Sequence, residues 1–383
     1  MSGGPRILIA GAGIGGLALA QSLRHGGLEV AVYERDPTPK TRNQGYRIHI
    51  DPNGNSALRT CLPAQALDRV RRTSGVNGDL VASYTHQLAR VMAQTFPGIP
   101  SDEITHVDRD TFREGLLTGL ADTVRFGQTV AGYQITGQGR IRVDFVEGGS
   151  AEGDLLVGAD GVSSAVRRQL LPHATTRDVG LRCIYGRMTI DETTDTLIPE
   201  DFNRGFCWVA DEHGYGAGFA TVRFRSRPEG ASNYLMTTLV ATSERLGMPD
   251  DKLFKLPPED LRQIAVEATT DWHPAIRKLF AHADTDTFFP ITIRASERID
   301  AWQPGPVTLL GDAIHTMPPT GGVGANTALQ DAATLSGELL SAARGEKSLT
   351  AAIAAYERVM LPRGFETIEN SLRTADQMFA KAD

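Results

Sequence analysis

Cysteine and long apolar runs are scarce in this sequence. Its 383 residues include three cysteines, and Cys61, Cys183 and Cys207 form neither a CxxC pair nor a metal-ligand spacing. The sparse count predicts buried thiols in a reducing cytoplasm, with no metal site. No stretch approaches the ~20 uninterrupted apolar residues of a spanning helix, so we expect no membrane span.

Basic tracts are also missing. Acidic residues outnumber basic ones by 46 to 39, which gives a formal net charge of −7. An acidic chain repels polyphosphate, so nucleic acid is not an expected partner. The length indicates roughly two domains. We expect a small organic molecule as the partner, and a chain that works as a monomer or homodimer.

Glycine, in contrast, is abundant and clustered. The first cluster separates a buried strand predicted over residues 6–10 from a helix predicted over 15–25, and a second strand is predicted over 29–33. This strand, helix, strand order is typical of a parallel sheet covered by helices.

The first cluster has the spacing of a dinucleotide-binding turn. Gly11 permits the tight turn, Gly13 lets a pyrophosphate approach the backbone, and Gly16 lets helix and strand pack closely. The N–H groups at the start of the helix, from Ile14 onward, favour an anion. Glu34 follows the second strand, where a carboxylate can accept hydrogen bonds from a ribose. The motif alone does not distinguish NAD from FAD.

Two further motifs follow short buried strands. Asp160 and Gly161 come after the strand predicted over 154–157, and Asp312 comes after the strand predicted over 307–310. The carboxyl ends of such strands are where α/β folds place ligand contacts. The glycines of residues 321–324 then begin another helix, whose N–H groups could face an anion.

These three motifs, in this order, resemble the group A flavoprotein monooxygenases, which have the para-hydroxybenzoate hydroxylase-like fold. The resemblance covers nearly the whole chain and is strongest at its two ends. It implies an α/β architecture, with a Rossmann-like FAD-binding domain, an inserted sheet-rich substrate domain and C-terminal helices. The implied boundaries are 1–180 and 294–383 for the two parts of the FAD-binding domain, and 181–293 for the substrate domain.

The resemblance also implies a set of FAD contacts. They are Gly11, Gly13, Ile14, Gly16, Glu34, Arg35, Arg109, Asp160, Asp312, Gly322, Gly324, Ala325 and Asn326. Residues 45–53 resemble the stretch beside the flavin ring, which makes Arg47 and His49 possible cavity residues; no residue is assigned as catalytic. Val323 stands where many relatives have glutamine, so a role that needs that side chain is in doubt.

The implied activity centres on the flavin. NADPH or NADH would reduce FAD, dioxygen would form a flavin C4a-hydroperoxide, and a bulky, aromatic substrate would be hydroxylated or epoxidised. A flavin halogenase is disfavoured because no WxWxIP signature occurs. A plain NAD dehydrogenase leaves the second and third motifs without a role. A flavoprotein oxidase or dehydrogenase and a non-catalytic flavin-bearing binding protein remain alternatives.

Several local predictions complete the analysis. Asp110 is expected to cap a helix over 111–121, residues 123–146 to form a meander, and residues 325–381 to form helices broken at Gly345 and Pro362. We expect His315 to be structural and Asp331 to cap or pack within the last helix pair. Some aromatic residues of the middle segment should line the substrate cavity, although core packing is the default for each: Phe206, Trp208, Tyr215, Phe219 and Phe224.

Overall fold

A five-stranded parallel sheet forms one half of the molecule. The computed structural model describes residues 4–40, 46–137 and 139–379. The strand order is β17-β11-β1-β2-β7. The strands are β1 (Arg6–Ala10), β2 (Glu29–Glu34), β7 (Val124–Phe126), β11 (Leu155–Gly158) and β17 (Val307–Leu309). Most of their residues are buried, as expected for parallel strands covered by helices.

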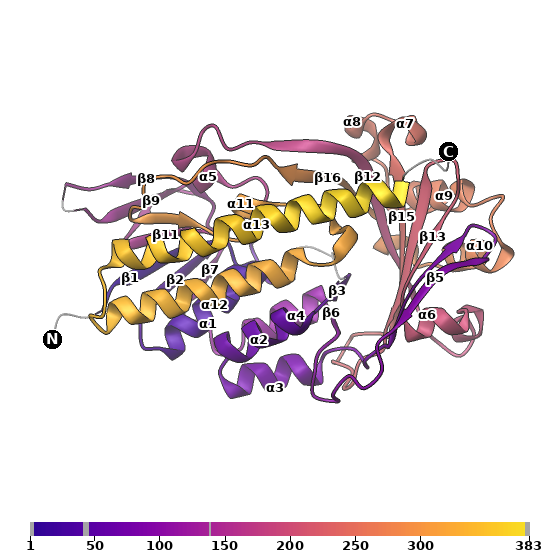
Figure 1. Cartoon of the computed structure of the whole chain (residues 1–383), viewed down its shortest axis with the longest axis horizontal. Coiled ribbons are helices and arrows are strands. Elements are labelled where there is room, and N and C mark those ends of the chain that lie inside the picture. The colour runs from indigo at the N-terminus through magenta and orange to yellow at the C-terminus, as the bar shows by residue number, and fades with distance from the viewer. Residues whose placement is uncertain (1–3, 41–45, 138, 380–383) are drawn as a thin grey trace.

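Helices from both ends of the chain cover this sheet. Figure 1 shows three of them side by side: α1 (Ile14–His25), α12 (Gly324–Ala343) and α13 (Leu349–Phe379). The packing is close, since a Cβ built on Gly15 of α1 would lie 3.2 Å from the Cβ of Ala328 on α12. The neighbouring helices are α2 (Pro52–Cys61), α3 (Ala64–Arg72) and α4 (Arg109–Leu116).

A seven-stranded sheet forms the other half (Figure 1). Its order is β16-β12-β15-β14-β13-β4-β5, and only the β13–β4 pair is parallel. The strands are β4 (Leu80–Thr85), β5 (Arg90–Thr95), β12 (Thr176–Thr189), β13 (Gly205–Ala210), β14 (Tyr215–Val222), β15 (Tyr234–Thr242) and β16 (Phe289–Ser296). Most of this sheet is inserted between β11 and β17, which confirms the α/β class with an inserted sheet-rich unit.

Short helices cover one face of the seven-stranded sheet. They are α6 (Glu200–Arg204), α7 (Ser243–Leu246), α8 (Asp250–Leu253), α9 (Pro258–Ala268) and α10 (Pro274–Ala281). Phe202, Phe219 and Phe280 are fully buried between helices and sheet. The opposite face therefore remains available to a ligand.

The remaining elements are short. They are β3 (Arg47–His49), β6 (His106–Asp108), β8 (Val130–Ile135), β9 (Ile141–Phe145), β10 (Ser150–Gly153), α5 (Ala165–Leu170), α11 (Asp312–His315) and three short 3-10 turns at Thr194–Leu197, Thr285–Thr287 and Pro319–Gly321. β3 pairs with β6, and β8 to β10 form an antiparallel sheet.

Three local predictions are corrected by the structure. The segment over 123–146 is not one meander, because β7 pairs in parallel with β2. The N-cap of α4 is Asp108, whose Oδ1 accepts a 2.9 Å hydrogen bond from Thr111 N, and not Asp110. Pro362 does not break the last helix, which runs on to Phe379. Pro362 has no N–H to donate, so the helix lacks one backbone hydrogen bond there. The packing of the buried face of α13 compensates for that loss.

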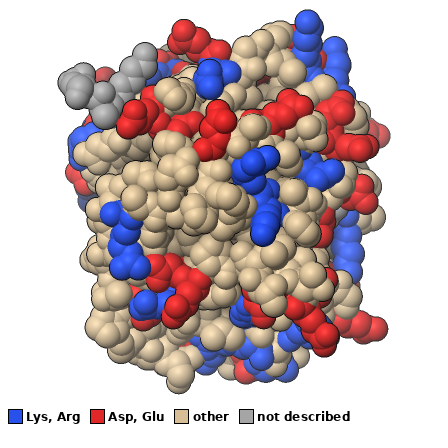
Figure 2. Space-filling model, turned by 90° about the vertical axis from the view of Figure 1, so that its right-hand side faces the viewer, with Lys and Arg blue, Asp and Glu red and all other residues tan. Residues whose placement is uncertain are grey.

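The surface of the sheet end carries charges of both signs. Figure 2 shows Lys and Arg interspersed with Asp and Glu there, around an uncharged central area. Within the described part of the chain, no helix combines the length and apolar character needed to cross a membrane.

Candidate FAD and substrate site

A cavity of about 2790 Å³ lies between the two halves. One side is formed by the carboxyl ends of the parallel strands, and the other by the free face of the seven-stranded sheet. Of the predicted FAD contacts, the structure brings all but Asn326 to its wall.

The glycine turn has the geometry that its spacing predicts. Gly11 has φ +103°, and a Cβ there would lie 2.4 Å from Ala159 O. A Cβ on Gly16 would lie 2.2 Å from Gly11 O, so this contact requires glycine. A Cβ on Gly13 would meet nothing within 4 Å, and Gly13 caps α1 without a side-chain hydrogen bond. The turn therefore presents open space and free N–H groups to the cavity, as a pyrophosphate requires.

Glu34 lines the cavity beside this turn. Its carboxylate accepts hydrogen bonds from Ala12 N at 2.8 Å and from Asp36 N at 3.0 Å. Arg113 Nη2 lies 3.3 Å from Glu34 Oε2, and Arg113 Nε donates to Ala12 O at 2.9 Å. Glu34 thus holds the loops together as well as facing the site, and exposed Arg35 lines the cavity next to it.

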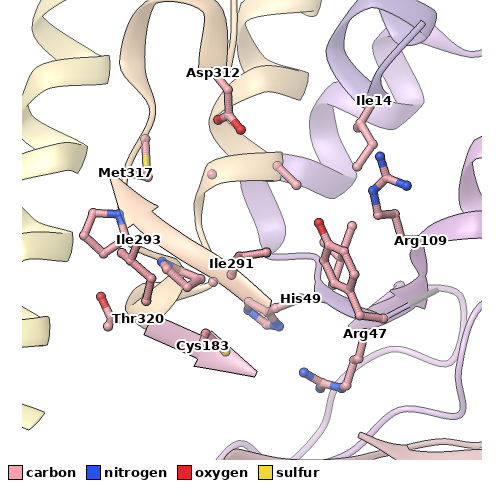
Figure 3. Close-up of a pocket in the computed structure, with 18 of the residues that line it drawn as sticks. Ile14, Arg47, His49, Arg109, Cys183, Ile291, Ile293, Asp312, Met317 and Thr320 are labelled. Carbon is pink, nitrogen blue, oxygen red and sulfur yellow. The ribbon is translucent and has the colours of Figure 1, made fainter. Parts of the chain in front are cut away.

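Arg113 is a site residue that the sequence reasoning missed. It lies one turn after Arg109 on α4, and a spacing of four residues puts both on the same helix face. Arg109 faces the cavity near Ile14 (Figure 3), with its guanidinium carbon 5.8 Å from the centre of the Tyr46 ring. The four-residue spacing between Arg109 and Arg113 is the sequence pattern from which Arg113 could have been predicted as a site residue.

The second motif organises the start of α5. Asp160 accepts hydrogen bonds from Ser164 Oγ at 2.5 Å and Ala165 N at 2.7 Å. Arg167 Nη1 donates to Ala313 O at 2.9 Å, which links this motif to the third one. Asp160 lines the cavity and at the same time fixes its own loop.

The third motif is held by a buried ion-pair network. Asp331 accepts from Gly311 N at 3.0 Å, His315 Nε2 at 2.5 Å and Arg363 Nη2 at 2.8 Å. Burial alone would raise the pKa of Asp331, but His315 and Arg363 lower it overall. Burial likewise opposes the charge of His315, yet Asp331 raises its pKa.

Asp312 differs from its neighbours in this network. His315 and Asp331 are almost fully buried and lie away from the cavity wall, which agrees with their expected structural roles. Asp312 is exposed and projects into the cavity (Figure 3).

The N-terminus of α12 lies against β3. Gly322, Gly324 and Ala325 line the cavity. The side chain of Asn326 is fully buried and joins the two segments, because Nδ2 donates to the carbonyls of His49 and Gly322, both at 3.0 Å. Asn326 therefore positions the cavity wall, and Val323 also lies outside the wall.

β3 brings both predicted cavity residues to the wall. His49 is exposed to the cavity, and its Nδ1 lies 2.9 Å from Thr105 O. The predicted segment over 45–53 starts at Gly45, which lies outside the described residues.

Alternate residues of the seven-stranded sheet line the cavity. Phe206 and Trp208 on β13 face it, whereas Cys207 and Val209 face the helices. Phe219 and Phe224 belong to the core, and Tyr215 packs under Arg245 away from the cavity. Apolar residues of the wall that the sequence reasoning missed include Cys183, Tyr185, Met236, Val240, Ile291 and Ile293.

The cysteines and the possible metal ligands show no sign of a disulfide or a metal site within the described residues. All three cysteines are free and buried, as expected. The described residues contain no cluster of histidine, cysteine, aspartate or glutamate that could hold a metal ion.

Comparison with known proteins identifies the family of this chain. The family model described as "FAD binding domain" matches residues 117–371, and that of an NAD(P)-binding Rossmann-like domain matches residues 9–61. The chain therefore belongs to the FAD binding domain family. The open turn at Gly13, the Asp312 side chain and the α12 N-terminus fit FAD, which is the cofactor.

The similar proteins are flavin enzymes. The dual O-methyltransferase/FAD-dependent monooxygenase CTB3 of Cercospora beticola is 30% identical over 98% of this chain and 46% of its own length. The chain thus spans about half the length of the first curated relatives it matches. The 6-hydroxynicotinate 3-monooxygenase of Pseudomonas fluorescens is 28% identical over 88% of this chain and 82% of that enzyme.

Solved structures share the whole fold. HpxO of Klebsiella pneumoniae, solved with FAD and uric acid, has a TM-score of 0.81 and 25% identity, covering 98% of this chain and 89% of that chain. A chain from Photorhabdus luminescens subsp. laumondii TTO1, classed with FAD containing monooxygenases, has a TM-score of 0.87 and 31% identity and covers 98% of both chains.

Proposed function

We propose that this protein is an FAD-dependent monooxygenase that consumes NADPH or NADH and hydroxylates or epoxidises a bulky, aromatic organic substrate. The observation that carries the proposal is that one continuous cavity joins the glycine turn and Asp312 to an apolar, aromatic sheet face. FAD, when bound, supplies hydride acceptance and the activation of dioxygen.

The residues of the chain bind, orient and exclude water. Gly13 and the start of α1 would hold the pyrophosphate, and Asp312 would hold the ribityl region. The N–H groups at the start of α12 are not capped by a side chain. Such pre-aligned donors, when they face developing negative charge, contribute about 3 kcal/mol.

The substrate wall favours an aromatic molecule. Phe206 and Trp208 contribute aromatic rings to this wall, and Met236 and Ile291 contribute apolar side chains. An apolar cavity also keeps water from a reactive oxygen species.

The proposal extends to the setting of the reaction. Residues 1–180 and 294–383 would bind FAD, and residues 181–293, joined by β4 and β5, would bind substrate. Dioxygen would be the co-substrate of a monomer or homodimer. The three buried free thiols favour a reducing cytoplasm.

Isotope labelling tests the proposal. Holoenzyme supplied with NADPH or NADH, a panel of polycyclic phenols and labelled dioxygen should transfer one heavy oxygen atom to the product, detected by mass spectrometry. Substrate should also accelerate NAD(P)H oxidation. Label taken from water, or turnover undiminished without oxygen, would instead favour a dehydrogenase; flavin binding without turnover would favour a binding protein.

A further inference from the structure

Arg47 is an unusual arginine in this structure. It lies on β3 and lines the cavity, and its Nε is buried without a hydrogen-bond partner. Among the described residues, no carboxylate lies within ion-pair distance of its guanidinium.

The guanidinium groups of the fully buried arginines all donate hydrogen bonds or form ion pairs, whereas the half-buried Arg47 does neither within the described residues. Arg113 contacts Glu34, Arg182 contacts Asp178 and Asp250, and Arg167 donates to two backbone carbonyls. An uncompensated buried cation is costly, so proteins normally provide a partner. The exception at Arg47 therefore needs an explanation.

The acidic residue opposite Arg47 on β6 already has hydrogen-bond partners. It is Asp108, and its carboxylate accepts from Thr111 N at 2.9 Å and from Tyr234 Oη at 3.0 Å. The other titratable groups close to Arg47 are the buried hydroxyl of Tyr234 and the rings of His49 and His106. Burial first, and then the positive charge of Arg47, lowers the pKa of both histidines. The two histidines are therefore neutral, and no carboxylate among the described residues makes an ion pair with Arg47.

Arg47 also lies far from the nucleotide end of the cavity. Figure 3 shows it on the opposite side from Asp312 and Ile14, with its guanidinium turned away from them. The apolar wall of Cys183 and Ile291 lies on that same side. A charge here would meet the substrate and not the phosphates of the cofactor.

We propose that Arg47 binds an anionic oxygen group on the substrate, so that the substrate is a planar aromatic molecule bearing a carboxylate or an acidic enolate. The planar fork of a guanidinium matches the two oxygens of either group. Bound in this way, the aromatic body would lie along the sheet face and be directed toward the flavin site. The inference rests on the proposed function only in assuming that the cavity takes an organic substrate.

Matched acid and neutral probes test the inference. The FAD-loaded protein is titrated with a hydroxynaphthoate and with its carboxamide, and with acetylcyclohexanedione and its methyl enol ether, followed by the flavin difference spectrum. At least one acid should bind about 10- to 100-fold more tightly than its neutral partner. The pair that shows the preference distinguishes carboxylate from enolate.

Variants assign the preference to Arg47. Arg47→Met should abolish it while leaving the affinity for the neutral probe unchanged, and Arg47→Lys should retain part of it. The control is Arg294→Met, because Arg294 is an exposed arginine on the cavity rim; this variant should keep the full preference. Ligand-free Arg47→Met holoenzyme should melt no lower than the wild type, since no hydrogen bond is lost.

Three results would overturn the inference: no binding of any acid, equal affinities within each pair, or a preference that survives in Arg47→Met. A lower melting temperature of Arg47→Met with unchanged preference would identify Arg47 as structural and overturn it too. Failure of oxygen transfer to any substrate would contradict the proposed function, while an acid preference dependent on Arg47 would still stand.

Discussion

A substitution at Gly13 should affect cofactor binding without affecting folding. Its φ of −76° is accessible to any residue, and the space beyond its Cα is open. Gly13→Val should therefore fold normally but lose FAD, because the branched side chain occupies the space that the pyrophosphate needs. The measurement is flavin content after purification, together with the melting temperature of the apoprotein.

Two other glycines provide controls for this prediction. Gly305→Val adds a side chain at an open position outside the cavity and should retain FAD. Gly16→Val should fail to fold, because its Cβ would collide with Gly11 O. Normal flavin content in a folded Gly13→Val protein would rule out the proposed pyrophosphate position.

Asp312 and Asp331 should respond differently to truncation. Asp312→Ala should keep the melting temperature of the apoprotein and weaken FAD binding about 10- to 150-fold, as expected for a hydrogen bond to a carboxylate. Asp331→Ala leaves the Gly311 N–H and the His315 ring without their buried acceptor. It should lower stability by about 3–5 kcal/mol.

Denaturant melts of both apoproteins and FAD titrations would check this difference. Asp331→Asn, which keeps an oxygen for Gly311 N, should be less damaging than Asp331→Ala. Equal FAD dissociation constants for Asp312→Ala and the wild type would remove Asp312 from the site.

Residue roles were predictable where they depend on local geometry. Gly11, Gly13 and Gly16 act within one turn, so their spacing was informative. Asn326 was expected to contact FAD, but its amide joins α12 to β3, which lies far away in the sequence. Long-range hydrogen bonds of this kind leave no pattern in a single sequence.

At the scale of elements, α13 carries a buried acid beside the parallel sheet. Glu357 is 4% exposed and accepts a 2.8 Å hydrogen bond from Thr308 Oγ1 of β17. Burial raises the pKa of Glu357 from 4.5 to about 7, although the bond from Thr308 opposes the shift. Folding thus favours the protonated acid.

Glu357→Gln should therefore stabilise the protein at high pH. The wild type bears no ionisation penalty below pH 4.5, loses stability as the pH rises toward 7, and bears the full penalty, at most about 3 kcal/mol, above pH 7. The variant should melt higher than the wild type at pH 8 and about equally at pH 4.

The control for this prediction lies on the same helix. Glu369 is an exposed residue paired with Arg298, so Glu369→Gln should change stability only slightly at either pH. A Glu357→Gln protein that melts below the wild type at pH 8 would show that the ionised carboxylate is needed there.

Element boundaries were predicted less well than element types. The cap at Asp108 and the uninterrupted passage of α13 through Pro362 both depend on what the helices pack against. β7 has the same alternating residues as a meander strand, and only its pairing with β2 distinguishes it. Sequence periodicity reports the type of an element and not its partners.

At the scale of the molecule, the sequence prediction left two strands out of the seven-stranded sheet. β4 and β5 belong to it, although residues 80–95 precede the segment predicted to form it. β4 pairs in parallel with β13, so Leu80 lies opposite Gly205. A pairing across such a separation is chosen by the assembled core, whereas the order of motifs was enough to indicate the two-part architecture.

The order of the parallel sheet also governs when this protein can be completed during synthesis. β11 lies between β1 and β17, so the edge of the cavity that carries Asp312 forms only after Val307–Leu309 has been made. A ribosome adds about 5–20 residues per second, so the first strand waits tens of seconds for the last. Contacts so distant in sequence also form slowly. FAD can therefore be captured only late, and until then the nascent chain must keep its unpaired strands from aggregating.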